Sequence, residues 1–346
     1  MAKISVDVST LPGWSALAAK TYNITIVAKA NGYRDSEPSA AVSVEKAAPV
    51  YADCITFTGE TSDFTLKATN KAWDGTVEYS TNHNTWTVWD GSEISSSGKK
   101  LYLRGSGNTK FFTSNGAKFV LSARAACSGN IQTLLEYSNP PTSIPTSYCY
   151  GAMFSGCTSL TKAPALPATT LAEGCYAHMF DGCTSLTAAP ELPSTTLASF
   201  CYGGMFNGCS SLVQAPALPA TTLASYCYQE MFRNCSSLVQ APALPATTLA
   251  TACYGAMFNG CTSLTKAPEL PATTLADYCY EGMFYKCTGL KISSTQSSEY
   301  PTAWRIPSSG TISFTPASWC DQMLSYTSGT FRSDPSINTT YYGAWS

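Results

Sequence analysis

The chain has 346 residues and a formal net charge of −2, and charged residues make up only 12% of it, about half of the roughly 25% found in ordinary soluble domains. A chain with so few charges and no basic cluster is not expected to bind nucleic acid. It contains no run of about 18 apolar residues, so no membrane insertion is expected. The first residues lack the apolar core of a signal peptide, and none is expected in this chain.

The first predicted elements are three strand-like segments within residues 1–48, with sequences KISVDVS, YNITIVAKA and AAVSVEK. Three strands are too few to bury both faces of a sandwich, and their free edges can pair with another chain. We therefore expect this segment to anchor the protein, either to itself in a homo-oligomer or to a larger particle. The alternative is a small sheet that packs on the next domain.

Residues 49–128 alternate between apolar and polar side chains, as in FTLKAT, TVEYST and TWTVWD. This period of two predicts an antiparallel sandwich or meander. Trp73, Trp86 and Trp89 are expected to serve as core or edge aromatics, with a carbohydrate-binding platform as the alternative.

The next region is a repeat with a fixed period of 26 residues. The first five copies carry the pattern C-Y-x-x-M-F-x-x-C-x-S-L, followed by A-P-x-L-P, and the sixth, which starts at Cys279, has Gly289 in place of Ser and lacks A-P-x-L-P. One cysteine column begins at Cys149 and a second begins at Cys157. A period that never slips predicts a stacked repeat array rather than separate domains.

Within one copy, Cys149, Met153 and Cys157 are spaced by four residues, which predicts one stripe of a short helix. Pro164 and Pro167 exclude helix in the following segment, which is expected to be extended. We thus predict a mainly β N-terminal half, an α/β repeat solenoid over residues 129–291 and a C-terminal capping region over 292–346.

The regular cysteines raise the question of metal binding, disulfides or catalysis. The C-x7-C spacing does not fit zinc, and the sequence holds only two histidines. A catalytic thiol needs a neighbouring base that these copies lack, whereas disulfides between adjacent copies are not excluded by distance. The favoured interpretation is reduced cysteines that pack as small apolar residues. The tyrosine column that starts at Tyr150 is expected to cover the helix flank with its hydroxyls in water, or else to stack on sugars.

Positions that change from copy to copy are the candidate ligand-binding residues, because packing does not fix them. On the predicted helix they are His178, Asp181, Gln229, Glu230, Arg233, Tyr285 and Lys286. On the extended segment they are Lys162, Gln214, Gln240 and Lys266, with Ala188 in the same column. A solvated surface without function explains the same variation.

The repeat motif, over residues 149–291, resembles the BspA-like leucine-rich repeats of bacterial cell-surface and phage-encoded proteins. The segment TYNITIVAKANGYRDSEPSAAVSV resembles the last strands of an immunoglobulin-like or fibronectin type III-like domain. This resemblance implies a leucine-rich-repeat solenoid and a role in adhesion or host recognition, with a cell-surface glycan or protein as partner.

No phosphate-binding loop or hydrolase motif occurs, so we expect no enzyme activity and no cofactor. The expected function is a recognition module of a phage virion, as part of a fibre, tail or head decoration. In that setting residues 1–48 would contact other virion proteins or a second copy. The alternatives are a secreted or cell-surface bacterial adhesin, a purely architectural virion spacer, and a glycan-cleaving enzyme with paired carboxylates.

Overall fold

The computed structural model describes residues 21–24, 42–45, 54–71, 73–111, 117–292, 306–308, 318, 322–324 and 328–329. The chain divides into two compact units, Met1–Ala52 and Asp53–Ser346. In the first unit the described backbone is one antiparallel pair, formed by β1 (Thr21–Ile24) and β2 (Val42–Glu45). The rest of the predicted anchoring segment lies outside the described residues, so the anchoring role stays a prediction.

The second unit begins with two sheets. The first has six strands in the order β11-β10-β3-β8-β5-β6, and the second has three in the order β7-β4-β9. Their bounds are β3 (Ile55–Gly59), β4 (Thr65–Thr69), β5 (Thr76–Ser80), β6 (Thr87–Val88), β7 (Ile94–Ser95), β8 (Lys100–Ser106), β9 (Lys118–Leu121), β10 (Ala125–Ser128) and β11 (Leu160–Lys162).

These sheets form because apolar and polar residues alternate along their strands. In β3, Ile55 and Phe57 are fully buried while Thr56 and Thr58 are partly exposed, as expected for a sheet with one face on the core. Every pairing is antiparallel except that of β10 with β11. The prediction of a mainly β N-terminal half is therefore confirmed.

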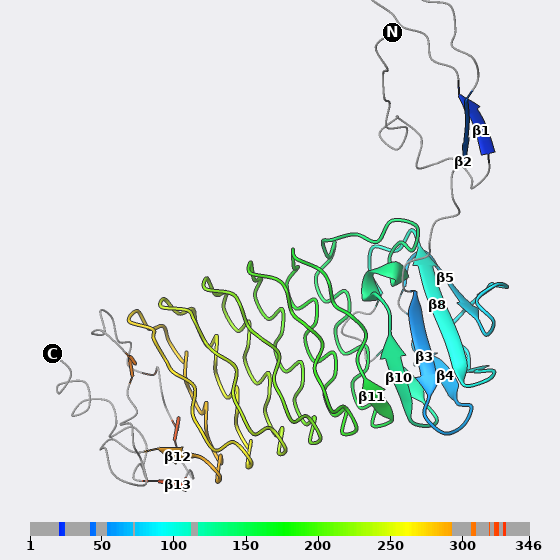
Figure 1. Cartoon of the computed structure of the whole chain (residues 1–346). Coiled ribbons are helices and arrows are strands. Elements are labelled where there is room, and N and C mark those ends of the chain that lie inside the picture. Colours follow the sequence, from blue (N-terminus) through cyan, green and yellow to red (C-terminus); the bar gives the residue numbers. More distant parts are fainter. Residues whose placement is uncertain are drawn as a thin grey trace, which may run out of the picture. The chain divides into compact units, whose positions relative to one another are not determined.

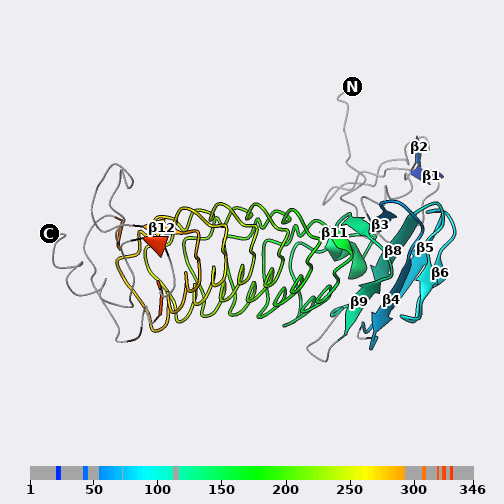
Figure 2. The same cartoon turned by 90° about the horizontal axis from the view of Figure 1, so that it is seen from below.

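From Tyr148 onward the 26-residue copies lie on top of one another as rungs of a stack (Figures 1 and 2). We number the rungs from 1 to 6, each beginning one residue before its first repeat cysteine, at residues 148, 174, 200, 226, 252 and 278. Parallel bridges join equivalent residues of successive rungs, such as Thr170 with Thr196 and Gln214 with Gln240. Each rung has a turn limb (residues 148–158 in rung 1) and an extended limb (residues 160–168 in rung 1).

The predicted short helix is wrong. The described residues contain no α-helix, and the turn limb is a run of four-residue turns. Alternate amides stay within the rung, as when the Met153 N–H donates to the Tyr150 carbonyl at 3.3 Å. The amides between them cross to the next rung, as when the Phe154 N–H donates to the Met179 carbonyl at 2.8 Å. The spacing of four between Cys149, Met153 and Cys157 thus reflects a turn of four residues, not a helical turn of 3.6.

Left-handed residues close these turns. In rung 1 they are Tyr148, Ala152 and Gly156, with φ of 56°, 56° and 70°. The equivalent three positions have positive φ in all six rungs. A right-handed helix cannot pass through such residues, so the limb bends instead of coiling. Two side chains point in and two point out in every turn.

The inward side chains of both limbs fill one core that is continuous with that of the sheets. Tyr150 stacks on Tyr176 at 5.8 Å and Phe154 on Phe180 at 5.5 Å, and both columns continue to rung 6. The expectation that the tyrosine hydroxyls lie in water is wrong, because all six side chains are at most 1% exposed. The Tyr150 hydroxyl instead donates to Gln132 Oε1 at 2.6 Å.

Both ends of the stack are covered within the described residues. Strand β10 pairs with β11 of rung 1, and the 3₁₀ helix η3 (Ile131–Leu134) is fully buried beside them. At the other end the Phe284 N–H donates to the Met323 carbonyl at 2.9 Å, which repeats the bond between earlier rungs. Strands β12 (Lys291–Ile292) and β13 (Ser328–Gly329) form a further parallel pair. The boundaries predicted at residues 49, 129 and 292 are not tested by this arrangement.

Candidate functional site

The cysteine columns lie inside the stack. All fourteen described cysteines are buried, with free thiols, and their predicted burial is confirmed. In the second column, from rung 2 onward, each thiol lies against the phenylalanine carbonyl of the preceding rung, as in the 3.1 Å contact from Cys209 Sγ to the Phe180 oxygen. Burial raises the pKa of the Cys201 and Cys209 thiols to about 12. Thiols of this kind are poor nucleophiles.

The described residues contain no group of three His, Cys, Asp or Glu side chains that could hold a metal ion. Buried Trp73 and Trp89 stack on each other at 5.2 Å in the core of the sheets. The expectation that these two tryptophans are core residues is confirmed. Trp86 is only partly buried, and the Arg104 guanidinium lies 4.1 Å from its ring centre.

The predicted ligand-binding residues fall on both limbs, with the core between them. Lys162, Gln214, Gln240 and Lys266 lie in one exposed column of the extended limb. His178, Asp181, Gln229, Glu230, Arg233, Tyr285 and Lys286 lie on the outer side of the turn limb. The two sets of residues therefore do not share one surface, and the stack has two separate candidate binding faces.

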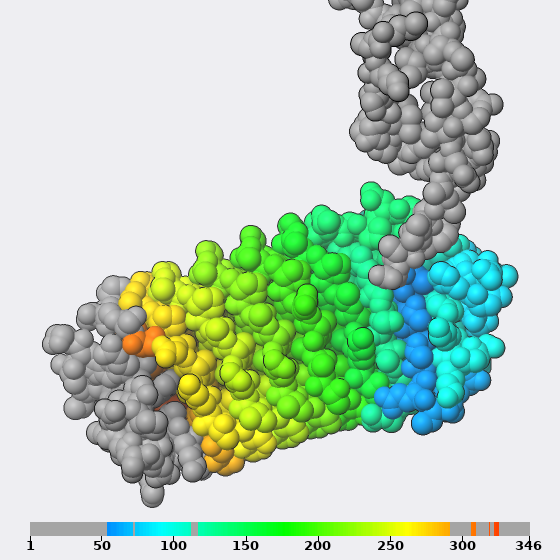
Figure 3. Space-filling view, in the orientation of Figure 1, coloured from blue at the N-terminus to red at the C-terminus, as the bar shows by residue number. Residues whose placement is uncertain are grey.

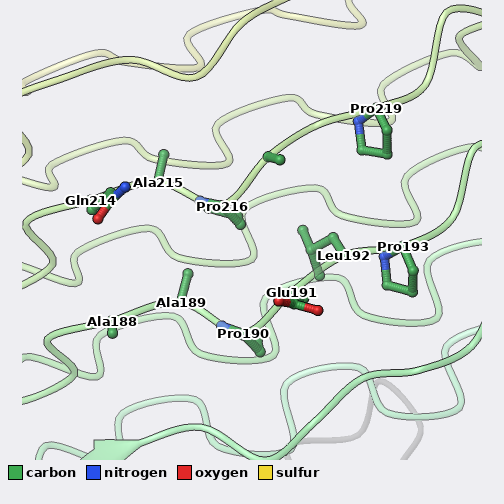
Figure 4. A pocket seen from close by; sticks show the side chains of 11 residues that line it. Ala188, Ala189, Pro190, Glu191, Leu192, Pro193, Gln214, Ala215, Pro216 and Pro219 are labelled. Atoms are coloured by element: carbon green, nitrogen blue, oxygen red, sulfur yellow. The ribbon is translucent and has the colours of Figure 1, made fainter.

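The extended limb is furrowed between adjacent rungs. One furrow between rungs 2 and 3 has a volume of about 460 Å³ and is lined by Pro190, Pro193, Pro216 and Pro219 with neighbouring alanines (Figure 4). The next furrow, between rungs 3 and 4, repeats this lining at about 450 Å³. Proline has no N–H to donate, so these parts of the rungs are not joined by a ladder of hydrogen bonds, and hollows remain.

The furrows offer little chemistry for selective binding. Their walls are mainly proline and alanine, and each furrow adds only two polar side chains, Glu191 and Gln214 in the first and Gln214 and Gln240 in the second. The lining is nearly the same in each copy, since the A-P-x-L-P segment repeats. Specific sites need a few well-placed polar groups within an apolar surface, and this face has few.

The turn limbs of rungs 2 to 4 carry a polar cluster, which we define as His178, Asp181, Asn207, Glu230 and Arg233. Asp181, Asn207 and Arg233 occupy the same position in three successive rungs. The rungs are joined beside them, because the Gly182 N–H donates to the Asn207 carbonyl and the Gly208 N–H donates to the Arg233 carbonyl, each at 2.7 Å. The parallel ridges of successive rungs are visible along the stack in Figure 3.

Charges within the polar cluster are paired. Arg233 Nη1 donates to Glu230 Oε1 at 3.0 Å, and His178 Nδ1 lies 3.6 Å from Asp181 Oδ2. The Asp181 carboxylate is the main reason that the pKa of His178 is raised, and Glu230 raises it further. The His178 ring lies over Gly204, where a Cβ would collide with it.

Two buried polar atoms of the cluster have no hydrogen-bond partner, namely Asn207 Oδ1 and Arg233 Nε. Buried polar atoms are nearly always hydrogen-bonded, so an unpaired one calls for an explanation. Both atoms lie below the surface, whereas the Glu230 and Arg233 side chains, which are 31% and 41% exposed, can contact a polar ligand.

The remaining predicted residues lie around the polar cluster or beyond it. Gln229 is partly exposed next to Glu230. Tyr285 and Lys286 lie two rungs further along, where the Lys286 ammonium is 5.2 Å from the centre of the Tyr285 ring. These two residues therefore do not share a compact site with the cluster.

The sequence interpretation missed a third outward column on the turn limb, which we call the aromatic column. It is formed by the residue before the first cysteine of each copy: Tyr148, Gly174, Phe200, Tyr226, Ala252 and Tyr278. Phe200 stacks on Tyr226 at 4.4 Å with nearly parallel rings, both partly exposed. The sequence could have indicated this column, because the three outward positions of the turn limb are spaced by four residues, as at 148, 152 and 156 in rung 1.

No family model, curated protein or solved structure matches the chain. Among the residues that the structure describes, no helix is long and apolar enough to cross a membrane.

Proposed function

We propose that the stack is a leucine-rich-repeat solenoid of the BspA-like class and that the protein is a non-enzymatic recognition module. The rungs would act as a rigid scaffold, and the outer side of the turn limb would bind a cell-surface ligand. The observation that carries this proposal is the polar cluster, where Asp181, Asn207 and Arg233 take the same outer position in three successive rungs and the Glu230–Arg233 pair is partly exposed. A regular scaffold with side chains at fixed steps suits contacts at several points.

For the setting, we propose a phage virion component that acts as a fibre, tail or head decoration and docks through residues 1–48 onto other virion proteins or a second copy. The sequence pattern of the repeats supports this setting, and so do buried thiols, which suit assembly in a reducing compartment. A secreted or cell-surface bacterial adhesin would use the same face. A virion spacer without ligand is the second candidate.

A binding assay on whole bacteria tests the function. Full-length protein carrying a fluorescent label is titrated onto a panel of bacterial strains, beside two variants. The turn-limb variant changes Gln229, Glu230 and Arg233 to Ala, and the matched control changes Gln214 and Gln240 on the extended limb to Ala. We expect the wild type and the control to bind the same strains and the turn-limb variant to lose binding.

Three outcomes contradict this proposal. If the wild type labels no strain, the spacer function is favoured. If the control loses binding while the turn-limb variant keeps it, the ligand lies in the furrows instead. Release of soluble sugar from the labelled cells would show an enzyme.

A further inference from the structure

The aromatic column holds bulky side chains in a backbone conformation that suits glycine. Phe200 and Tyr226 have φ of 57° and 60°. Left-handed backbone costs an L-residue about 1–2 kcal/mol, and it is a clear outlier for bulky side chains. The same position is glycine in rung 2, at Gly174 with φ of 56°. Glycine is therefore compatible with the fold at this position, and the backbone conformation gives no reason for an aromatic residue there.

These rings are also not part of the core. The buried tyrosine column repeats in every rung, with ring centres 5.8–6.0 Å apart. In contrast, the Phe200–Tyr226 pair stacks at 4.4 Å outside that column and leaves part of each ring in solvent. Strained residues that the fold does not need are concentrated at functional sites.

The ring pair lies in rungs 3 and 4, which also hold Asn207, Glu230 and Arg233 of the polar cluster. Phe200 precedes Gly204 by one four-residue turn in rung 3, and Tyr226 precedes Glu230 by one such turn in rung 4. The turns are closed by hydrogen bonds, since the Gln229 N–H donates to the Tyr226 carbonyl and the Arg233 N–H to the Glu230 carbonyl. Along the outer side of the limb, the rings therefore come one turn before the Glu230 carboxylate and within two turns of the Asn207 amide and the Arg233 guanidinium.

We propose that Phe200 and Tyr226 together with Asn207, Glu230 and Arg233 form a binding site for a neutral hexopyranose unit of a glycan. The C–H face of a pyranose packs on aromatic rings, which supply apolar area while tolerating nearby polar groups. Vicinal sugar hydroxyls donate to the Glu230 carboxylate, and they accept from the Arg233 guanidinium and from the amide NH2 of the partly exposed Asn207 side chain.

The charges favour a neutral sugar over an acidic one. The cluster has two carboxylates, Asp181 and Glu230, against one guanidinium, Arg233, so its net charge is −1 with His178 neutral and zero with His178 protonated, and it is positive in neither state. A uronic or sialic acid would bring a further carboxylate towards Glu230. This proposal rests on the recognition function proposed above and names its ligand class.

The first experiment probes an array of immobilised neutral and acidic oligosaccharides with the full chain and three variants. Tyr226→Gly and Asn207→Ala should each weaken binding to a neutral glycan at least about tenfold. Tyr278→Gly is the matched control, because Tyr278 has the same backbone conformation, with φ of 57°, in the same column two rungs away. It should bind like the wild type.

Thermal melting separates a binding role from a structural one. Because glycine removes the backbone strain that offsets the lost ring packing, Tyr226→Gly should melt within about 3 °C of the wild type. A much lower melting temperature with unchanged binding would make Tyr226 a structural residue and overturn the proposal. Preference for acidic glycans would overturn the assignment to a neutral sugar.

The second experiment separates this proposal from the general recognition function. Strains that the wild type labels are treated with periodate, which cleaves vicinal diols, or with protease. Loss of binding after periodate alone is the expected result. Loss after protease alone would overturn the glycan site and leave a protein-binding module. Absence of binding to any untreated strain would instead contradict the recognition function itself.

Discussion

At the scale of single residues, the sign of φ decides what each outward position of the turn limb accepts. Gly208 has φ of +71°, and a Cβ there would have ordinary contacts with Gly182. Gly203 does not have positive φ, and a Cβ there would lie 3.4 Å from the Phe200 carbonyl oxygen. Alanine occupies the equivalent position in rung 2, as Ala177.

The change Gly208→Ala should therefore destabilise the protein by about 1–2 kcal/mol, the cost of left-handed backbone. Gly203→Ala, with the same added methyl group, should change stability by less than about 0.5 kcal/mol. Urea unfolding of the two variants beside the wild type measures the difference. Equal effects of the two changes would argue against left-handed turns in the limb.

The sequence could predict part of this detail but not all of it. The step of four between Cys149, Met153 and Cys157 fits a helix almost as well as a four-residue turn, since 3.6 and 4 differ little over two turns. Non-glycine residues at left-handed positions, such as Tyr148 and Glu230, hide the signal that glycine gives at Gly156. Hydrogen bonds between rungs, which determine the choice, are not local in sequence.

His178 gives the polar cluster a dependence on pH. Its pKa is raised in the folded state by the Asp181 carboxylate and then by Glu230, so the folded protein binds the proton more tightly than the unfolded chain does. The resulting stabilisation is complete below the ordinary histidine pKa of about 6.5 and is lost as pH rises through the folded pKa.

We expect the melting temperature of wild type minus that of His178→Gln to be larger at pH 5.5 than at pH 8. The comparison uses buffers of equal ionic strength, because exposed charges are screened by salt. A difference that is the same at both pH values, or larger at pH 8, would contradict the pairing of His178 with Asp181.

At the scale of the elements, each rung presents two limbs of different chemistry. The proline-lined extended limb is nearly constant, while the turn limb varies and carries the polar cluster. The predicted pattern of buried cysteines, Met, Phe and Leu could be read from the sequence because every copy repeats it. The ion pairs of the polar cluster, His178 with Asp181 and Glu230 with Arg233, each lie within one rung; their geometry could not be predicted, because the spacing of four residues also fits a helix.

The buried cysteine columns should be inert to thiol reagents in the folded protein. At pH 8, a thiol with a pKa of about 12 is ionised at about one part in ten thousand. Native protein treated with iodoacetamide should therefore carry almost no label on the repeat cysteines, and denatured protein should be labelled fully. Mass spectrometry of tryptic peptides measures the extent of labelling in the native and the denatured protein. Rapid labelling of Cys201 or Cys209 in native protein would contradict their burial.

At the scale of the whole molecule, stability comes from contacts between neighbouring rungs. The amides that cross rungs join residues 25 apart, from the Tyr150 N–H to the Cys175 carbonyl and onward in each rung. Loss of one complete rung keeps every later register, whereas loss of half a rung shifts all inward side chains.

Deletion of residues 201–226, one full period, should thus leave a folded protein with cooperative melting. Deletion of residues 201–213, half that length, should abolish cooperative melting. Circular dichroism during heating distinguishes the two. Folding of both deletions would mean that the rungs do not depend on their register.

Hydroxyl-radical footprinting of the bound protein tests recognition through the turn limb most directly. Oxidation of side chains is compared by mass spectrometry between free protein and protein mixed with surface polysaccharide from a strain that it labels. We predict that Phe200 and Tyr226 are protected while Val213 and Val239, which are exposed on the extended limb, are oxidised as before. Protection of Val213 and Val239 with unchanged oxidation of Phe200 and Tyr226 would contradict the account.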